Sequence, residues 1–175
     1  MRSRVRSGPL SGADIKRLFE QLDAELAAMD VRGEVYLVGG AVMCLVHDAR
    51  ESTRDVDAYF KPAQELRAAA AKVAARNDLP ETWLTDAVKA FLSEHGSFNR
   101  FLELGHLTVY AAEPAYLLAM KCLSARIGEE FHDIDDIRYL LRYLNLNSAA
   151  DARAVIERYY PLERFPQKTL YLLDE

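Results

Sequence analysis

The feature that most restricts the possible folds is an apolar strand that stops at two adjacent glycines. Residues 34–39 read EVYLVG, a run of β-branched and aromatic side chains that is typical of a buried strand. Gly40 follows Gly39, and the next residues, AVMCLVHD, are expected to form a short helix. Such a turn leaves backbone N–H groups bare at the start of a helix, where an anion such as phosphate can approach.

Two carboxylates follow this turn on a second strand. The segment DVDAYF alternates polar and apolar residues, so Asp55, Asp57 and Tyr59 are expected to share one face of a strand. Neighbouring carboxylates raise each other's pKa unless a cation neutralises them. Oxygen ligands of this kind suit Mg²⁺ held jointly with the phosphates of a nucleotide. The stretch is therefore interpreted as a phosphate-binding turn beside two metal ligands.

Neither the glycine pair nor the aspartate pair is by itself strong evidence for a phosphate or metal site. Paired glycines are often only a tight turn, and an Asp-x-Asp pair is often a solvated strand edge. The spacing lacks the third glycine of a dinucleotide-binding fingerprint, and no Gly-Lys-Ser follows as in a P-loop. The interpretation depends on the order strand, two glycines, helix and then a strand with two aspartates.

Helices are predicted where apolar residues recur at helical spacing next to capping signals. The first follows the capping residue Ser11, and others are expected over 63–76, 81–92, 113–127, 133–144 and 148–159. The apolar face of the first helix comprises Ile15, Leu18, Phe19, Leu22 and Leu26.

A hairpin is predicted over FNRFLELGHLTVYAA, with Gly105 supplying a positive φ in the turn and Leu104 paired with Leu107. The fold class is therefore α/β (α+β), a mixed sheet flanked by helices with a helical C-terminal part. We expect residues 1–112 to form the α/β core and 113–175 to pack on it, as a single compact domain.

Composition limits the location and the partners. The 175 residues are half apolar, and 22 Lys plus Arg against 27 Asp plus Glu give a formal charge of −5, which argues against a broad nucleic-acid-binding surface. Cys44 and Cys122 are expected to be buried free thiols. The longest uncharged apolar stretch is too short to span a bilayer and no signal peptide is evident, so we expect a cytoplasmic protein without a membrane partner.

The glycine pair and the segment STRDVD together resemble the signature of the DNA polymerase β-type nucleotidyltransferase superfamily. The resemblance is closer to the AbiEii-like branch of toxin–antitoxin and abortive-infection proteins. It continues through LPETWLTDAVKAFL and EPAYLLAMKCLSARIGEEFHDIDDIRYLL and covers roughly residues 13–145.

This resemblance implies transfer of a nucleoside monophosphate from a nucleoside triphosphate, with Mg²⁺ or Mn²⁺ as cofactor. Gly39 and Gly40 would hold phosphate, and Asp55 and Asp57 would hold metal. The acceptor would be RNA, such as a tRNA end, or a protein hydroxyl, and the chain would be the toxin with a cognate antitoxin. Lys121 would meet phosphate charge, and Asp133 would match a later acidic motif.

The chain departs from the pattern of that superfamily at the glycine pair. Many members carry a serine there, whereas this chain has Ala41, so Ser52 or Thr53 would have to supply the hydroxyl. Arg50 and Arg54 flank the aspartates and are candidate phosphate contacts, with charge-balancing surface arginines as the alternative.

A third carboxylate often completes the metal site from another strand. Glu103 of the hairpin is the candidate, with a solvated glutamate as the alternative.

Three further alternatives remain open. Lys121 can be a structural lysine on an apolar helix, and Asp133 can simply stabilise a helix start. His132-Asp133 also resembles the metal site of HD phosphohydrolases, which requires further histidines. Finally, the chain can be a binding module that keeps the fold without the activity.

Overall fold

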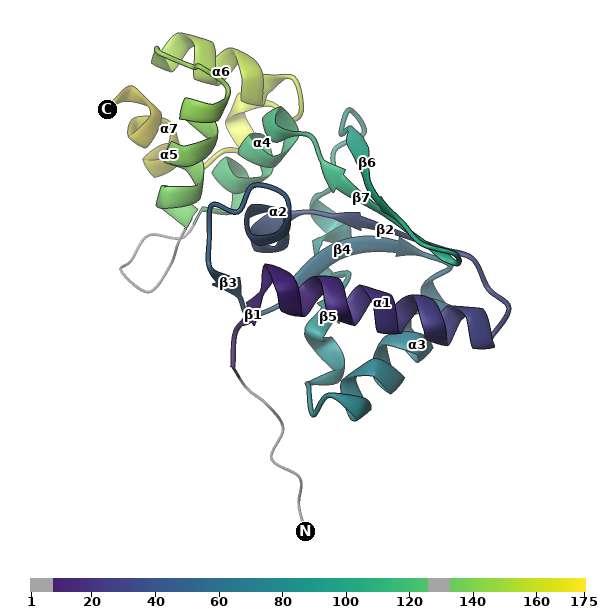
Figure 1. Cartoon of the computed structure of the whole chain (residues 1–175). Coiled ribbons are helices and arrows are strands. Elements are labelled where there is room, and N and C mark those ends of the chain that lie inside the picture. Colours follow the sequence, from purple (N-terminus) through teal and green to yellow (C-terminus); the bar gives the residue numbers. More distant parts are fainter. Residues whose placement is uncertain (1–7, 126–132) are drawn as a thin grey trace. The chain divides into compact units, whose positions relative to one another are not determined.

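The structure, a computed structural model, describes residues 8–125 and 133–175 (Figure 1). Its elements confirm the mixed α/β class with C-terminal helices. The chain divides into two compact units. The first contains the described residues up to Ala90 together with Phe98–Ala111, and the second contains Phe91–Ser97 and the described residues from Ala112 onward. The change of unit at Ala112 lies next to the expected boundary at Glu113.

The first unit is built on a mixed five-stranded sheet whose central strand is β2, Gly33–Leu37. This strand runs antiparallel to β4 and parallel to β7, and it is therefore hydrogen-bonded on both sides. The strand order is β5-β4-β2-β7-β6. The other strands are β4 (Val56–Lys61), β5 (Leu84–Thr85), β6 (Phe98–Glu103) and β7 (Leu107–Ala112), and a separate pair joins β1 (Leu10–Ser11) to β3 (Ser52–Thr53).

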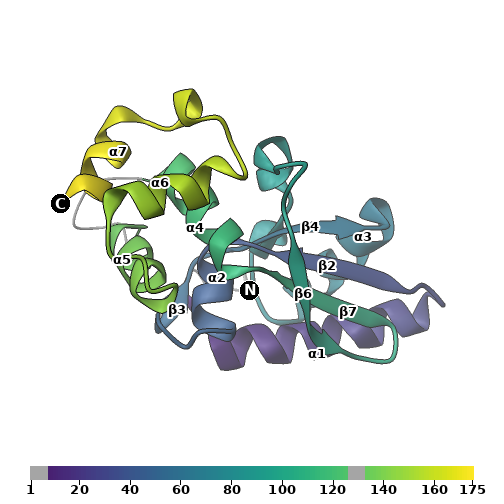
Figure 2. The same ribbon diagram turned by 90° about the horizontal axis from the view of Figure 1, so that it is seen from above.

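Two helices, α1 (Gly12–Ala28) and α3 (Ala63–Arg76), cover one face of this sheet (Figures 1 and 2). Alternate strand residues such as Val35, Ala58 and Val109 are buried beneath them. Burial of this apolar face is the main driving force for the packing of the unit. The residues between them in the strands point to the opposite face of the sheet.

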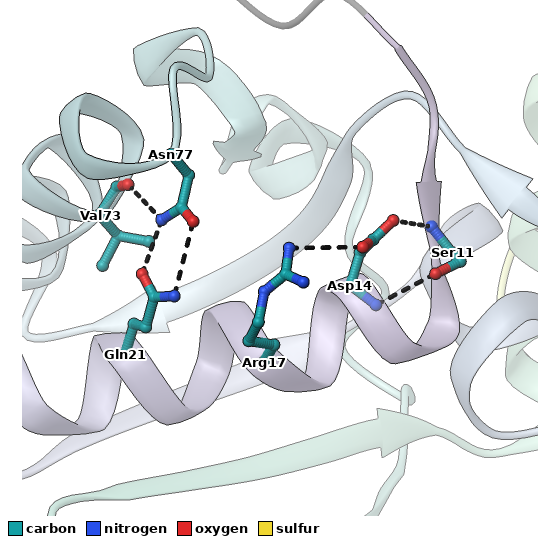
Figure 3. A network of polar contacts seen from close by, with 6 residues as sticks. All are labelled: Ser11, Asp14, Arg17, Gln21, Val73 and Asn77. Carbon is teal, nitrogen blue, oxygen red and sulfur yellow. Dashed lines mark hydrogen bonds and ion pairs between the residues drawn. The ribbon is translucent and has the colours of Figure 1, made fainter.

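The start of α1 is fixed by a capping box at Ser11 (Figure 3). The backbone N–H of Asp14 donates to the Ser11 hydroxyl at 3.1 Å, and the backbone N–H of Ser11 donates to the Asp14 carboxylate at 2.9 Å. These bonds satisfy donors that a helix start leaves open. The predicted apolar face is confirmed, because its five residues are all buried.

Side-chain amides link α1 to the end of α3 (Figure 3). The Asn77 amide nitrogen donates to Gln21 at 2.6 Å and to the backbone oxygen of Val73 at 2.8 Å. The second bond satisfies one of the last carbonyls of α3, and the first fixes the two helices against each other. Both helices thus pack as one layer on the sheet.

The helix predicted over 81–92 is wrong. The segment instead forms a 3₁₀ turn at Glu81–Trp83, the short strand β5 and a second 3₁₀ turn at Ala87–Phe91. The Trp83 indole N–H donates to the buried carbonyl of Ala70 at 3.0 Å, and Leu84 pairs with Val56 at the sheet edge. These tertiary contacts outweigh the local helical propensity.

The hairpin of β6 and β7 is confirmed, and the Leu104 N–H donates to the Leu107 carbonyl at 2.8 Å as that pairing requires. Gly105 was expected to supply a positive φ and does not, so that prediction is wrong. Nothing lies within 4 Å of a Cβ placed on Gly105.

The second unit is helical, with α4 (Pro114–Ser124), α5 (Asp133–Tyr143), α6 (Ala149–Glu157) and α7 (Gln167–Asp174). Two hydrogen bonds hold residues 91–97 within this unit. The Tyr160 hydroxyl donates to the carbonyl of Phe91 at 2.5 Å, and the Ser93 hydroxyl donates to the carbonyl of Tyr159 at 2.6 Å. Among the described residues of both units, no helix has the length and apolar character needed to cross a membrane.

Replacing Ser11 by Ala is expected to lower the free energy of unfolding by about 1 kcal/mol, because the Asp14 N–H loses its acceptor. Trp83 is the only tryptophan in the sequence and is buried in the first unit, so its fluorescence in a urea titration reports this loss. Lys16→Ala, at an exposed position of the same helix, is the matched control. Equal midpoints for the two variants would contradict the role of the cap.

Candidate functional site

The glycine pair forms a sharp passage from β2 into α2, which spans Gly39–Leu45. Val38 is extended and its N–H donates to the carbonyl of Asp57 at 3.0 Å, so the chain is still paired with β4 at this point. Gly39 then adopts φ +68°, in the left-handed region that disfavours residues with a Cβ. The helix begins at Gly39 itself, two residues earlier than predicted.

The carboxylate of Asp57 lies against Gly39. A Cβ placed on Gly39 would stand 3.2 Å from the Asp57 carboxylate oxygen Oδ2 and 3.7 Å from its Cβ. Asp57 is half-buried and lies between the buried residues Val56 and Ala58 of β4, so its side chain belongs to the sheet face opposite α1 and α3. The absence of a side chain at Gly39 is what admits the carboxylate.

A cation and a hydroxyl lie against the second glycine. A Cβ placed on Gly40 would stand 2.6 Å from the Arg50 guanidinium nitrogen Nη1 and 2.7 Å from the hydroxyl oxygen of Thr53. Thr53 is buried, and its hydroxyl donates to the carbonyl of Asp55 at 3.2 Å. Pairing of β3 with β1 fixes this segment beside the start of α1.

We name these residues the glycine-pair cluster. It contains one carboxylate, one guanidinium and one hydroxyl, all against two residues of bare backbone. The members are Gly39, Gly40, Arg50, Thr53 and Asp57.

The two aspartates are not equivalent. Asp55 was expected on the strand beside Asp57, but β4 begins at Val56 and Asp55 is exposed just before it. Arg54, a predicted phosphate contact, is also exposed, whereas Arg50 is the arginine that reaches the glycine pair. Both arginines were candidates from the sequence. They differ in the structure because the path of the chain between α2 and β4 brings only Arg50 to the glycine pair.

Glu103 is not brought to Asp57. It lies on the edge strand β6, three strands away from β4, which corresponds to roughly 14 Å at about 4.8 Å per strand. The registers also place Glu103 near the start of β2, whereas Asp57 lies at the end of that strand. Glu103 is exposed and forms an ion pair with Arg100 at 3.2 Å.

A metal site with three protein ligands is not found in the part of the chain that the structure describes. No group of three His, Cys, Asp or Glu side chains among residues 8–125 and 133–175 could hold a metal ion. His132 of the alternative phosphohydrolase motif lies outside the described residues. A metal at the glycine-pair cluster would therefore depend on Asp57 and on oxygens of its substrate.

Lys121 belongs to the second unit, where it is buried and forms ion pairs with two aspartates. Its ammonium lies 2.8 Å from a carboxylate oxygen of Asp136 and 3.3 Å from one of Asp133, and all three side chains are less than a tenth exposed. These contacts join α4 to the first turn of α5. Both aspartates therefore have a defined structural role, and the functional role that the resemblance implies for Asp133 stays a prediction.

The two cysteines are buried thiols outside any disulfide, as the sequence predicts. Cys44 in α2 and Cys122 in α4 are both buried and not disulfide-bonded. Burial raises the pKa of the Cys122 thiol to about 12, because the thiolate would lose its hydration. Cys122 is therefore a protonated packing residue at neutral pH.

The comparisons with known proteins identify no relative. No protein-family model matches the chain, and no characterised protein or solved structure shows significant similarity to it. The geometry of the glycine-pair cluster is consequently the basis for a proposed function.

Gly39→Ala is expected to lower the free energy of unfolding by about 1–2 kcal/mol, because the left-handed φ strains a residue with a Cβ and the new methyl group meets Asp57. Urea titration followed by Trp83 fluorescence measures the change. The control is Gly105→Ala, where a Cβ meets open space, and its effect should stay within about 0.5 kcal/mol. If both glycines tolerated alanine equally, the constraint at Gly39 would be refuted.

Lys121→Met is expected to lower the free energy of unfolding by about 3–5 kcal/mol, because it removes the ammonium that pairs with two buried carboxylates. Helical circular dichroism in a urea titration gives the value. The matched control is Lys168→Met on α7, an exposed position where the change should be within about 0.5 kcal/mol. A stability loss no larger than that of the control would show that the buried ion pairs contribute little.

Proposed function

We propose that this protein is a divalent-metal-dependent nucleotidyltransferase that moves a nucleoside monophosphate from a nucleoside triphosphate to a hydroxyl. The observation that carries the proposal is the convergence of Asp57, Arg50 and Thr53 on the Gly39–Gly40 backbone. A carboxylate suits a metal ion and a guanidinium suits phosphate oxygens, and the two glycines let both side chains lie against the backbone.

The donor groups at the cluster fit Mg²⁺ or Mn²⁺ in one specific way. Mg²⁺ is commonly held by one or two carboxylates together with substrate phosphates, and it keeps several water ligands. Asp57 would be the principal ligand, and Asp55 could join only from its exposed position before β4. When bound, the metal would neutralise charge on the phosphates and orient them.

The chain's own residues would position the reaction. Arg50 and Thr53 would hold phosphate oxygens beside Gly40, where Thr53 supplies the hydroxyl that Ala41 cannot. The acceptor oxygen bonds to the α-phosphorus as the bond from that phosphorus to the bridging oxygen breaks. Pyrophosphate leaves, and the hydroxyl proton passes to water. Holding the reactants in line is the main contribution of such a site.

A phosphate contact by Lys121 and a part for Asp133 in a later acidic motif are further elements of the proposal. Their ion pair supports the second unit, and a nucleotide contact for Lys121 would have to exist alongside that pairing. RNA, such as a tRNA end, or a protein is the proposed acceptor class. The AbiEii-like resemblance further suggests that the protein acts as a toxin with a cognate antitoxin.

A second candidate function is a nucleotide-binding or partner-binding module without turnover. Two observations favour it: the structure brings no third carboxylate to Asp57 among the described residues, and Glu103 lies at the other end of the sheet. Nucleotide binding with metal but without transfer would support this module.

The test is a label-transfer assay. The protein is incubated with Mg²⁺ or Mn²⁺, each α-labelled nucleoside triphosphate in turn, and a cell extract as the source of acceptors. Asp57→Asn is expected to reduce transfer by at least about a hundredfold, because it removes the principal metal ligand. Asp55→Asn is expected to reduce it less, because Asp55 is exposed outside β4.

Glu103→Gln is the matched carboxylate control and should retain full transfer. Label on RNA or on protein identifies the acceptor class. Equal transfer by the Asp57→Asn variant would rule out the proposed site, and no transfer by the native chain despite nucleotide binding would favour the inactive module.

A further inference from the structure

Three tyrosines stand side by side across the middle of the sheet. Tyr59 on β4 and Tyr110 on β7 are each paired in register with Tyr36 on β2. The rings of Tyr36 and Tyr110 are stacked, with centroids 4.7 Å apart and planes within 8°, and the Tyr59 ring lies 5.9 Å from Tyr36. We name Tyr36, Tyr59 and Tyr110 the tyrosine row.

The tyrosine row lies on the sheet face opposite α1 and α3. The neighbouring strand residues Val35, Ala58 and Val109 are buried beneath those helices, while the three tyrosines are partly exposed. The Tyr36 and Tyr110 rings cover one another face to face, and the Phe98 ring packs edge-on against Tyr36 at 5.2 Å, so Tyr59 at the end of the row is the member whose ring face suits a ligand.

The hydroxyl groups of the row differ in their partners. The Tyr36 hydroxyl donates to the Glu34 carboxylate, and burial together with this bond raises the pKa of Tyr36 above its ordinary value. Within the part of the chain that the structure describes, the hydroxyls of Tyr59 and Tyr110 have no hydrogen-bond partner. Tyr36 is therefore fixed by its neighbour, and the two outer tyrosines retain polar groups available to a ligand.

The tyrosine row is continuous with the glycine-pair cluster. Asp57 and Tyr59 are two residues apart on β4 and share one face of the sheet. Two residues of a strand span about 7 Å. A nucleotide whose phosphates lie at Asp57 can therefore extend along this face and place its base against the ring of Tyr59.

We propose that Tyr59, the member of the tyrosine row nearest to Asp57 in the chain, stacks the base of the nucleoside triphosphate bound at the glycine-pair cluster. This inference rests on the proposed function and assigns the base a place that the cluster alone does not give. Stacking on aromatic rings accepts every base, since each base has a π-face. All four nucleoside triphosphates should therefore bind with similar affinity.

The experiment compares two ligands by titration calorimetry on the full chain in Mg²⁺. One is ATP, and the other is inorganic tripolyphosphate, which has the phosphates and no base. ATP should bind more tightly than tripolyphosphate. Tyr59→Leu should weaken ATP binding about tenfold and leave tripolyphosphate binding unchanged, because only the stacking surface is lost. Tyr59→Phe keeps the ring and should retain ATP binding.

The control is Tyr143→Leu on α5, an exposed tyrosine in the second unit whose replacement should leave both affinities unchanged. Trp83 fluorescence verifies that the first unit of each variant is folded. A measurement that needs no variant supports the same conclusion: base protons of ATP should move upfield in the NMR spectrum of the complex with the native chain.

The outcomes separate the two proposals. If ATP and tripolyphosphate bind equally and Tyr59→Leu changes neither, base stacking is overturned while phosphate binding at the cluster stands. If neither ligand binds the native chain, the proposed function fails and the inference fails with it. If Tyr59→Leu weakens binding of a short single-stranded oligonucleotide but not of ATP, the row takes an acceptor base, which overturns the inference as stated.

Discussion

The pairing of β2 with β4 is the interaction on which the first unit depends. It sets Leu37 opposite Ala58 and carries the ladder on to the hydrogen bond between Val38 and Asp57. Because this bond holds Asp57 level with the end of β2, the left-handed turn at Gly39 brings the backbone directly under its carboxylate. The same register aligns Tyr59 with Tyr36 and so builds the tyrosine row.

In the second unit, ion pairs compensate for the burial of charged side chains. Lys121 would be costly to bury alone on an apolar helix, and two carboxylates from α5 compensate for its desolvation. A buried lysine on an apolar helix is thus satisfied within its own unit. Asp133 and Asp136 of the first turn of α5 make this pairing, and acidic residues there favour a helix start in any case.

Much of the fold could be predicted because local signals and tertiary packing agree there. The capping residue Ser11, the five apolar positions of α1 and the bounds of α3 were all readable from spacing. The segment 81–92 was not, because Trp83 and Leu84 gain their bonds from α3 and β4, which are distant in the sequence. Local propensity carries no information about such contacts.

The sequence by itself determined the residue types of the candidate site: two glycines after a strand, and carboxylates, arginines and hydroxyls a short distance on. Only the tertiary structure decided which of them meet. Arg50 and Asp57 lie against the glycine pair, whereas Arg54 and Asp55 do not. Glu103 lies on a distant edge strand. The physical reason is that strand register and order depend on hydrogen bonds between segments far apart in the chain, and a single residue of register moves a side chain to the other face.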